Sequence, residues 1–463
     1  MKRETIALLF CGLTLISIVA TNAGAQGIQP YPDAITDWGI HTETWMAPPP
    51  VNTVFTDPDF GSAMVRATDR TTNFKNPGSW LRTAASGEAN MWSVDTSKFY
   101  VIGEGGVDLA FAFDPSTMAI SSLPGAEPGQ ALHVPLRPEA SFSFVDPDLI
   151  YGTTSSAPLT INSYRFSSGV LTPVFDTTTC GTQPPLVKDG HLVVSDDDVT
   201  LSADDSRISI SEGGKNSGSD MFVIVYDKNL GCRWYNTQTG EIGGQWGPSG
   251  FATTADTYLI RHAYISRSGS YVQILNDDHF GAFIWDVASL NVTDCPLDGD
   301  LFCGGYGVVG YNSYVNGAGY IDDMNILKRP LSNLAQFTQL VSPLPSPPHF
   351  GDTKHFTWSN VDAKDSLPVC GSTYSYAEDW QEYGITRPFE EEIFCVETDG
   401  IASTIWRFAH NRATWQTPYF NTQPLGNISM DGHFFLFTSG WDGQLGSEPN
   451  GTPLSDVWIV KLD

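Results

Sequence analysis

The sequence predicts an all-β fold: a seven-bladed β-propeller of three- to four-stranded antiparallel blades, with the ring closed by N- and C-terminal strands. Two observations predict it. Short apolar runs pair across turns that contain Asp, Gly or Ser, and these pairs recur at intervals of roughly fifty residues. One such sheet cannot bury both of its faces alone, whereas radial packing between two neighbours buries them.

The clearest copy of the repeat is residues 426–439, where two apolar runs flank a turn at Asp431. Earlier copies occur at residues 54–69, 91–105, 142–154, 198–211 and 262–275, with a degraded copy at 355–369. Third strands are expected at 109–114, 161–166, 222–227, 282–286 and 457–462, and an outer strand at 232–236. We expect residues 38–42 to complete the last blade. A large β-sandwich with an extra domain is the alternative fold.

The N-terminal end is typical of a secretory signal peptide. Lys2 and Arg3 precede an apolar run at residues 6–20, and residues 23–25 are small, as cleavage requires. The predicted organisation is a signal peptide at 1–25, an N-terminal segment with the closing strand at 26–50, and the propeller at 51–463. An uncleaved anchor is the alternative, but the run is shorter than the roughly 20 residues that span a bilayer. We therefore expect a secreted or periplasmic protein with no membrane span.

The chain is strongly acidic, because 52 Asp and Glu residues face 24 Lys and Arg residues, which leaves a net charge of −28. Such a charge repels phosphate backbones, so nucleic acid is not expected as a partner. It also slows the approach of any other polyanion, unless basic side chains gather locally at the binding site. We expect a monomer that binds a glycan or another extracellular ligand.

The cysteine count also favours an exported protein. Removal of the signal peptide leaves an even number of cysteines, which favours disulfides in an oxidising compartment. The expected pairs are Cys295 with Cys303, Cys370 with Cys395, and Cys180 with Cys232. No pair has C-x-x-C spacing, which disfavours a zinc site.

The repeat has counterparts in known families. Residues 429–434, read SMDGHF, resemble the repeats of TolB-type and WD-like propellers. The strands that begin at His262 and His355 are more distantly similar to secreted or periplasmic seven-bladed oligogalacturonate lyases. That resemblance implies elimination across a uronate ring by a His base and an Arg, with a divalent metal held by His and Gln side chains. Gln423 begins the last blade, but residues 424–426 after it include no His.

Equivalent positions on successive innermost strands should meet at the central channel. Six residues before each turn, the chain has Ala89, Ala140, Asp198, His262 and Leu425, and His355 holds the corresponding place in its copy. We expect Asp198, His262 and His355 to lie side by side. They could bind a divalent metal such as Mn²⁺ or Ca²⁺, or provide a base and its orienting carboxylate. Alternatively, each His hydrogen-bonds a neighbouring blade.

A second candidate cluster occupies residues 406–415, read WRFAHNRATW. Arg407 and Arg412 could bind carboxylates with two hydrogen bonds each, His410 could transfer protons, and Trp415 could stack on a sugar ring. We expect this stretch to cover one mouth of the channel. The alternative is a pair of structural ion pairs with the surplus acids.

The remaining ligand-binding candidates are Gln423 and two tyrosines, Tyr306 and Tyr311, of the Gly-rich run at 303–319. We interpret that run as a long loop, because it lacks the Gly-Lys-Ser/Thr ending of a phosphate loop.

Two functions therefore remain open. The first is action on extracellular glycans, most plausibly as a lyase of uronate-containing chains. The second is a non-catalytic extracellular binding scaffold. The chain has no G-x-S-x-G or H-E-x-x-H motif, which disfavours a serine hydrolase or a zinc protease.

Overall fold

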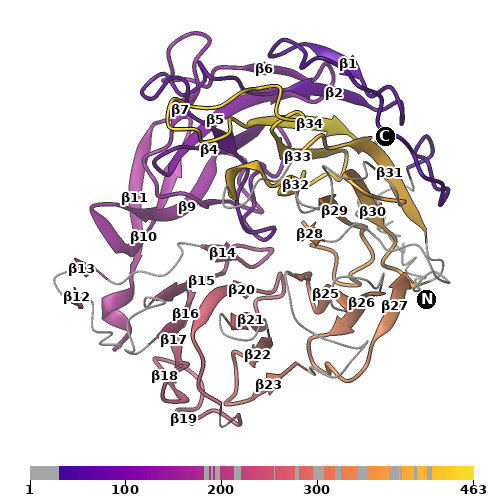
Figure 1. The fold of residues 1–463 in the computed structure, drawn as a ribbon. Helices are drawn as coiled ribbons and strands as arrows, with labels where there is room; N and C mark the ends of the chain where they lie inside the picture. The colour runs from indigo at the N-terminus through magenta and orange to yellow at the C-terminus, as the bar shows by residue number, and fades with distance from the viewer. Residues whose placement is uncertain are drawn as a thin grey trace, which may run out of the picture.

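The computed structural model describes residues 31–181, 187–188, 191–192, 199–212, 221–254, 256–276, 281–295, 307–318, 325–341, 353–359, 361–374, 385, 388–400, 404–413 and 420–463. Seven antiparallel sheets surround a common centre, as Figure 1 shows, so the predicted seven-bladed β-propeller is confirmed. The described sheets have four to six strands each rather than the predicted three to four. The predicted signal peptide lies outside the described residues.

The first four blades follow the chain in order, each listed from its innermost strand outward. The first contains β3 (Leu81–Arg82), β4 (Lys98–Gly103), β5 (Val107–Asp114) and β6 (Ala119–Ser121), with β7 (Leu132–His133) also paired to β5. The second contains β8 (Ser141–Phe142), β9 (Leu149–Thr154), β10 (Ala157–Arg165) and β11 (Val170–Asp176). The third contains β14 (Thr200–Leu201), β15 (Arg207–Glu212), β16 (Phe222–Asp227), β17 (Gly231–Asn236), β18 (Glu241–Gly244) and β19 (Gly250–Phe251). The fourth contains β20 (Ile260–Ile265), β21 (Tyr271–Asn276), β22 (Ala282–Asp286) and β23 (Val292–Asp294).

The last three blades complete the ring. The fifth contains β24 (Val308–Val309), β25 (Ser313–Ala318), β26 (Asn325–Pro330) and β27 (Thr338–Val341). The sixth contains β28 (Thr353–Thr357), β29 (Val369–Tyr374), β30 (Glu392–Val396) and β31 (Ile405–His410). The seventh contains β32 (Gly426–Ile428), β33 (Phe434–Ser439), β34 (Asp456–Lys461), β2 (Ala63–Arg66) and β1 (Val54–Thr56). A separate hairpin pairs β12 (Val187–Lys188) with β13 (His191–Leu192).

Strands from both ends of the chain close the ring, as predicted, but not the strand that we expected. β2 pairs antiparallel with β34, so that Met64 lies opposite Val460. Residues 38–42 have no regular secondary structure. The repeat copy at 54–69 is therefore the outer hairpin of the seventh blade rather than the start of the first. The apolar pattern of a hairpin is the same at the inner and outer positions of a blade, and only pairing distinguishes them.

The fifth blade begins where the sequence predicted a loop. Val308 pairs with Val315 across a turn at residues 310–312, inside the Gly-rich run. This turn lacks the Ser and Asp of the other copies, so the repeat was not visible there. Its exposed N–H groups are satisfied from the next blade instead, since Asp365 accepts hydrogen bonds from the backbone N–H groups of Tyr311 and Asn312.

Three of the other turns share one hydrogen-bonding pattern, which explains the recurring Ser and Asp in their sequences. In the first, third and seventh blades a Ser hydroxyl donates to the Asp two residues later, at 2.7 Å for Ser93, 2.8 Å for Ser202 and 2.5 Å for Ser429. The same hydroxyl oxygen accepts from the backbone N–H five residues on. The short side chains thereby take over bonds that the tight turn denies to the backbone.

The cores lie between the blades rather than inside one sheet. One apolar cluster joins Phe434 of the seventh blade, Phe99 of the first and Phe142 of the second. A second joins the sixth and seventh blades, and a third joins the third and fourth. Each sheet thus buries both faces against its neighbours, as the radial arrangement requires.

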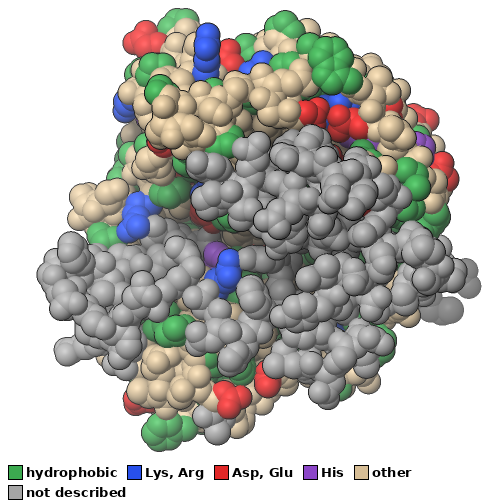
Figure 2. Space-filling model, in the orientation of Figure 1, with side chains coloured by type: hydrophobic (Ala, Val, Ile, Leu, Met, Phe, Trp, Pro, Cys, Tyr) green, Lys and Arg blue, Asp and Glu red, His purple; other side chains and the backbone are tan. Residues whose placement is uncertain are grey.

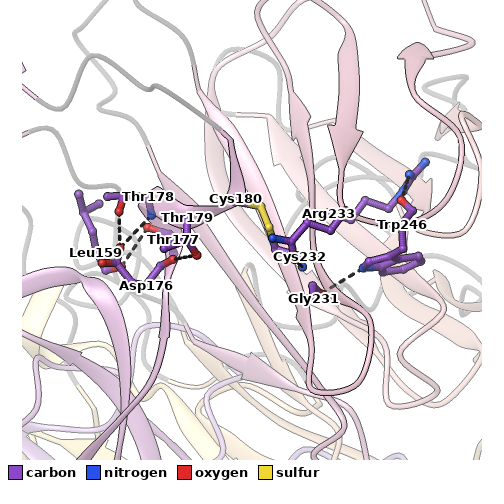
Figure 3. The surroundings of a disulfide bond; sticks show 11 residues. Leu159, Asp176, Thr177, Thr178, Thr179, Cys180, Gly231, Cys232, Arg233 and Trp246 are labelled. Atoms are coloured by element: carbon purple, nitrogen blue, oxygen red, sulfur yellow. Dashed lines mark hydrogen bonds between the residues drawn. A yellow bond between two sulfur atoms is a disulfide. The ribbon is translucent and has the colours of Figure 1, made fainter.

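Two predicted disulfides are confirmed. Cys370 and Cys395 are cross-strand partners on β29 and β30. Cys180 ends the short helix η1 (Thr177–Cys180), which follows the second blade, and bonds to Cys232 on β17 of the third blade. Figure 3 shows this link between two blades. Cys295 is also disulfide-bonded, whereas its predicted partner Cys303 lies outside the described residues.

Candidate functional site at the centre of the ring

Two of the predicted histidines lie on innermost strands. His262 is on β20 of the fourth blade and His355 is on β28 of the sixth, and both are largely buried, at 8% and 5% exposed. The fifth blade lies between them, so the prediction that His262 and His355 are on neighbouring blades is wrong. They are nevertheless close enough for His262 to influence the pKa of His355. Asp198, the third member of the predicted group, lies outside the described residues.

His355 hydrogen-bonds within the ring. Its Nε2 lies 2.8 Å from the backbone oxygen of Ala85, and because a carbonyl only accepts, Nε2 carries the proton. Burial, with a smaller contribution from His262, lowers the pKa of His355 to about 4, although the Ala85 carbonyl and Glu139 act in the opposite direction. The ring is therefore neutral at pH 7, which makes His355 a weak base.

His262 lies beside an irregularity in its strand. The pairing of β20 with β21 shifts register between Ile260 and His262, so Arg261 occupies a β-bulge. Bulges change the direction of neighbouring side chains and are frequent next to active sites. Arg261 is half-buried, and the His262 ring stacks on Tyr264 with 5.6 Å between ring centroids.

Two further charged residues join this group. Glu139 precedes β8 and has a positive φ of 68°, an uncommon backbone conformation for a residue with a side chain. Its Oε1 accepts a 2.8 Å hydrogen bond from the backbone N–H of Ala85 and lies 3.5 Å from the Arg82 guanidinium. Arg82, Glu139, His262 and His355 thus come from four blades. We call these four residues, together with Arg261 next to His262 on β20, the central cluster.

The segment at residues 84–90 crosses the centre of the ring between β3 and β4. Glu88 makes a buried ion pair with Arg267 of the fourth blade, at 2.9 Å, and accepts from the backbone N–H of Val309 in the fifth. Asn427 of the seventh blade donates to the Ala89 carbonyl at 2.7 Å. At Gly87, a Cβ would lie 1.8 Å from the Phe356 oxygen, so only glycine fits.

This segment leaves little space at its own level. The cavity beside it, lined in part by Tyr264, Val308 and His355, measures about 10 Å³. That volume suits a single water molecule. Figure 2 shows a His and a basic side chain near the centre of this face of the molecule.

The metal expectation has no support in the residues that the structure describes. No three His, Cys, Asp or Glu side chains among them are grouped to hold an ion. One nitrogen of His355 is committed to Ala85, and the central cluster contains two arginines, which oppose a cation. The central cluster therefore does not fit a divalent metal.

Arg407 lies at the outer edge of the ring, on β31, rather than over the channel. Its guanidinium donates to both carboxylate oxygens of Glu392, with Nε–Oε2 at 2.7 Å, and to Asp37 at 3.1 Å. Its backbone N–H donates to Ile35. Arg407 thus forms structural ion pairs, which was the alternative to a ligand-binding role, and these contacts hold the N-terminal segment against the sixth blade.

His410 and Arg412 belong to the same outer cluster and are fully buried. Arg412 pairs with Glu43 at 2.9 Å and faces Asp59 at 3.8 Å. Burial lowers the pKa of His410 to about 3, even though the nearby Asp59 opposes this shift. Arg412 also has a positive φ, as does Asp442 beside it. Neither residue is near the central cluster in the topology.

The remaining candidates are dispersed. Trp415 and Tyr306 lie outside the described residues. Tyr311 forms the turn of the fifth blade, and Gln423 follows the short helix η3 (Phe420–Thr422) before β32, where it is 8% exposed. Sequence reasoning missed Arg82, Glu139 and Arg261. Glu139 directly precedes Ala140, the channel position that the repeat predicts, so the repeat could have indicated it. No sequence pattern indicated Arg82.

The comparisons with known proteins support the fold. No known protein family and no curated protein sequence matches the chain. Among solved structures, an oligogalacturonate lyase in complex with manganese aligns with a TM-score of 0.56 and 13% identity, over 89% of this chain and 96% of its own. A Vibrio parahaemolyticus oligogalacturonate lyase aligns at 0.49 and 11%, over 88% and 96%. TolB from Acinetobacter baumannii aligns at 0.33 and 10%, over 60% of each chain.

The first of these similarities confirms the propeller architecture, which the sequence resemblance implied. At such low identity it carries no residue roles. Within the described part of the chain, no helix has the length and apolar character to span a bilayer.

Proposed function

We propose that the protein is an extracellular propeller that binds a uronate-containing glycan at the centre of the ring and cleaves it by elimination. The observation that carries the proposal is the placement of Arg82 on the innermost strand of the first blade and of Arg261 and His262 on that of the fourth, in a chain with a net charge of −28. Basic side chains gathered at one point reverse the local field that would otherwise repel an acidic sugar. The fold is also that of a manganese-bound oligogalacturonate lyase.

In the proposed reaction, His262 is the base. It takes the proton from C5 of the uronate, the electron pair forms the C4–C5 double bond, and the C4–O bond breaks. The departing oxygen takes a proton from water. Arg261 pairs with the uronate carboxylate, which makes the C5 proton more acidic. Glu139 holds Arg82 and the Ala85 backbone in place and so shapes the binding surface.

The test is the near-ultraviolet absorbance of the unsaturated product. The purified protein is mixed with polygalacturonate, alginate or a glucuronate polymer, with and without Mn²⁺ and Ca²⁺. We expect one polymer to yield product, and His262→Gln to lower the rate by about 100-fold or more, because general bases contribute that much. Binding of the polymer by calorimetry should persist.

His433→Gln is the matched control, since His433 is 46% exposed and remote from the centre. It should leave both rate and binding unchanged. Absence of product with every polymer would exclude the lyase reaction, and equal rates for His262→Gln and the unmodified protein would exclude His262 as the base.

A second candidate is glycan binding without catalysis. It is favoured by residues 84–90, which occupy the centre of the ring and hold His355 through the Ala85 carbonyl. For this function, calorimetry would detect binding without any product, and His262→Ala would leave the affinity within about twofold, a change of about 0.4 kcal/mol in binding free energy.

A further inference from the structure

A groove of about 520 Å³ lies on the side of the seventh and first blades, and none of the residues that line it belongs to the central cluster. It runs between the outer strands of the seventh blade and the first blade, near β2 and β6 in Figure 1. A second hollow of about 220 Å³ shares Val51, Asp69 and Thr71 with it, so the two form one channel along the surface, which we call the rim groove. Its volume is within the range of small-ligand sites.

The rim groove combines apolar walls with polar groups that face solvent. Pro48, Pro50 and Val51 form one wall, and Val51 is 38% exposed. Arg70 is exposed and has no ion pair among the described residues, while Asp69 uses only Oδ1, which accepts from the backbone and hydroxyl of Thr71. The Asp69 Oδ2 and the Arg70 guanidinium can therefore bind a ligand.

The second hollow holds an acceptor without a donor. Gln130 Oε1 is buried and accepts no hydrogen bond from the described residues. Buried amide oxygens in proteins nearly always have a donor, and a ligand hydroxyl would provide one. The unpaired Oε1 of Gln130 therefore points to a hydroxyl-bearing ligand, independently of Asp69 and Arg70.

The charge balance of the rim groove selects uncharged ligands. Arg66 is paired with Asp456, with Nε at 3.0 Å from Oδ2, and Arg70 is adjacent to Asp69. Two cations thus offset two anions, in contrast to the acidic surplus of the whole chain. Asp69 and Arg70, which line the same groove, offer an acceptor and donors to neighbouring sugar hydroxyls. The proline wall matches the apolar face of a pyranose ring.

We propose that the rim groove binds uncharged sugar units of a polysaccharide, at a site separate from the centre of the ring. This inference rests on the proposed glycan-directed function and extends it, because the two sites would hold different portions of one polymer. The centre would take the acidic units, and the rim groove would anchor the neutral stretches or side chains.

The test is affinity gel electrophoresis of the full chain in gels containing galactan, xylan or highly methyl-esterified pectin, and separately polygalacturonate. We expect at least one of the three low-charge polymers to retard the protein. The double variant Asp69→Asn, Arg70→Gln should weaken that retardation by about 10-fold or more, as the loss of charge-assisted hydrogen bonds predicts. Thr71→Trp, which fills the rim groove, should do the same.

Two controls separate this inference from the proposed function. Lys364→Gln removes an exposed charge on another blade and should change nothing. His262→Gln should keep its retardation by the low-charge polymers, while the rim groove variants should keep polygalacturonate binding and product formation. The inference is overturned if no low-charge polymer retards the protein, or if folded rim groove variants, checked by thermal unfolding, bind like the unmodified chain.

Discussion

The charged residues of this chain acquire their roles from partners far away in the sequence. Arg407 and Arg412 stand out because basic residues are scarce, and that scarcity suggested a ligand site. In the fold, acidic residues of the N-terminal segment surround both of them. A buried cation must be paired, since an unpaired one would cost several kcal/mol. Arg82 and Arg261, which have no distinctive sequence context, stand at the centre instead.

Glu43 allows a pH prediction at this scale. Burial, followed by the neighbouring Asp442, raises the pKa of Glu43 to about 8, while Arg412 opposes the shift. The unfolded chain loses this proton near its ordinary pKa, so the folded state loses stability as the pH rises toward 8. His410, whose pKa is lowered to about 3, contributes an opposite slope only below about pH 6.5. The effect of Glu43 is therefore clearest between pH 6.5 and 8.

We expect Glu43 to contribute a fall of up to about 1.4 kcal/mol per pH unit in the free energy of unfolding across that window. Glu43→Gln, which cannot ionise, should flatten the slope. Urea unfolding at pH 6.5, 7.2 and 8 measures it, with the exposed Glu127→Gln as control. Equal slopes for Glu43→Gln and the unmodified chain would show that Glu43 is already ionised at neutral pH.

At the scale of elements, the turns determine the hairpins. In the first, third and seventh blades, a Ser and an Asp two residues apart recur because their side chains bond the same backbone groups of the turn. The fourth blade has Ser268 in the Asp position, with 3.0 Å between the hydroxyls of Ser266 and Ser268. The fifth blade borrows Asp365 from a neighbour. A hydrogen bond between residues of one turn is thus visible in the sequence, whereas a hydrogen bond from a residue of another blade is not.

Asp95→Ala should show what one such turn contributes. Asp95 accepts from the Ser93 hydroxyl at 2.7 Å and from the Ser97 backbone at 3.1 Å, and the variant leaves these donors without their acceptor. Hydrogen bonds to a charged group predict a loss of about 1–3 kcal/mol in unfolding free energy. Asp95→Asn, which keeps one acceptor oxygen, should lose less. Calorimetric unfolding measures both, and an Asp95→Ala midpoint equal to that of the unmodified chain would contradict the assignment.

At the scale of the whole molecule, the closure of the ring couples the two ends of the chain. β2 and β1 continue the sheet that β32, β33 and β34 begin, so the seventh blade is complete only when both ends meet. Cys180–Cys232 adds a covalent link between two blades, 52 residues apart. Long-range pairings of this kind stabilise the ring and slow its formation.

Met64→Ala tests the closure. Met64 on β2 is fully buried in the cluster that joins the sixth and seventh blades. Removing its side chain should cost about 2–5 kcal/mol, as for other buried large-to-small changes. Val54→Ala on β1, where Val54 is 48% exposed, should stay within about 0.5 kcal/mol. Equal denaturation midpoints for the two variants would contradict the closure by β2.

Much of the fold could be predicted because propeller blades repeat. The innermost hairpins of six blades, the third strands and the disulfides Cys180–Cys232 and Cys370–Cys395 follow from patterns within a few dozen residues. The sequence shows seven hairpins because the copy at 54–69, an outer hairpin of the seventh blade, is counted and the inner hairpin of the fifth blade is not recognisable. The candidate site could be predicted only in part, since His262 and His355 were found through their place in the repeat.

The sequence alone therefore determined the class of fold and the approximate strand positions, because turn chemistry and apolar alternation act locally. The tertiary structure decided which hairpin closes the ring, that residues 84–90 cross its centre, and that Arg407 and Arg412 bind the N-terminal segment. These outcomes depend on burial and on hydrogen bonds between residues hundreds of positions apart. Such partners leave no periodic signal in a single sequence, because a buried charge requires a partner but does not specify where in the chain it lies.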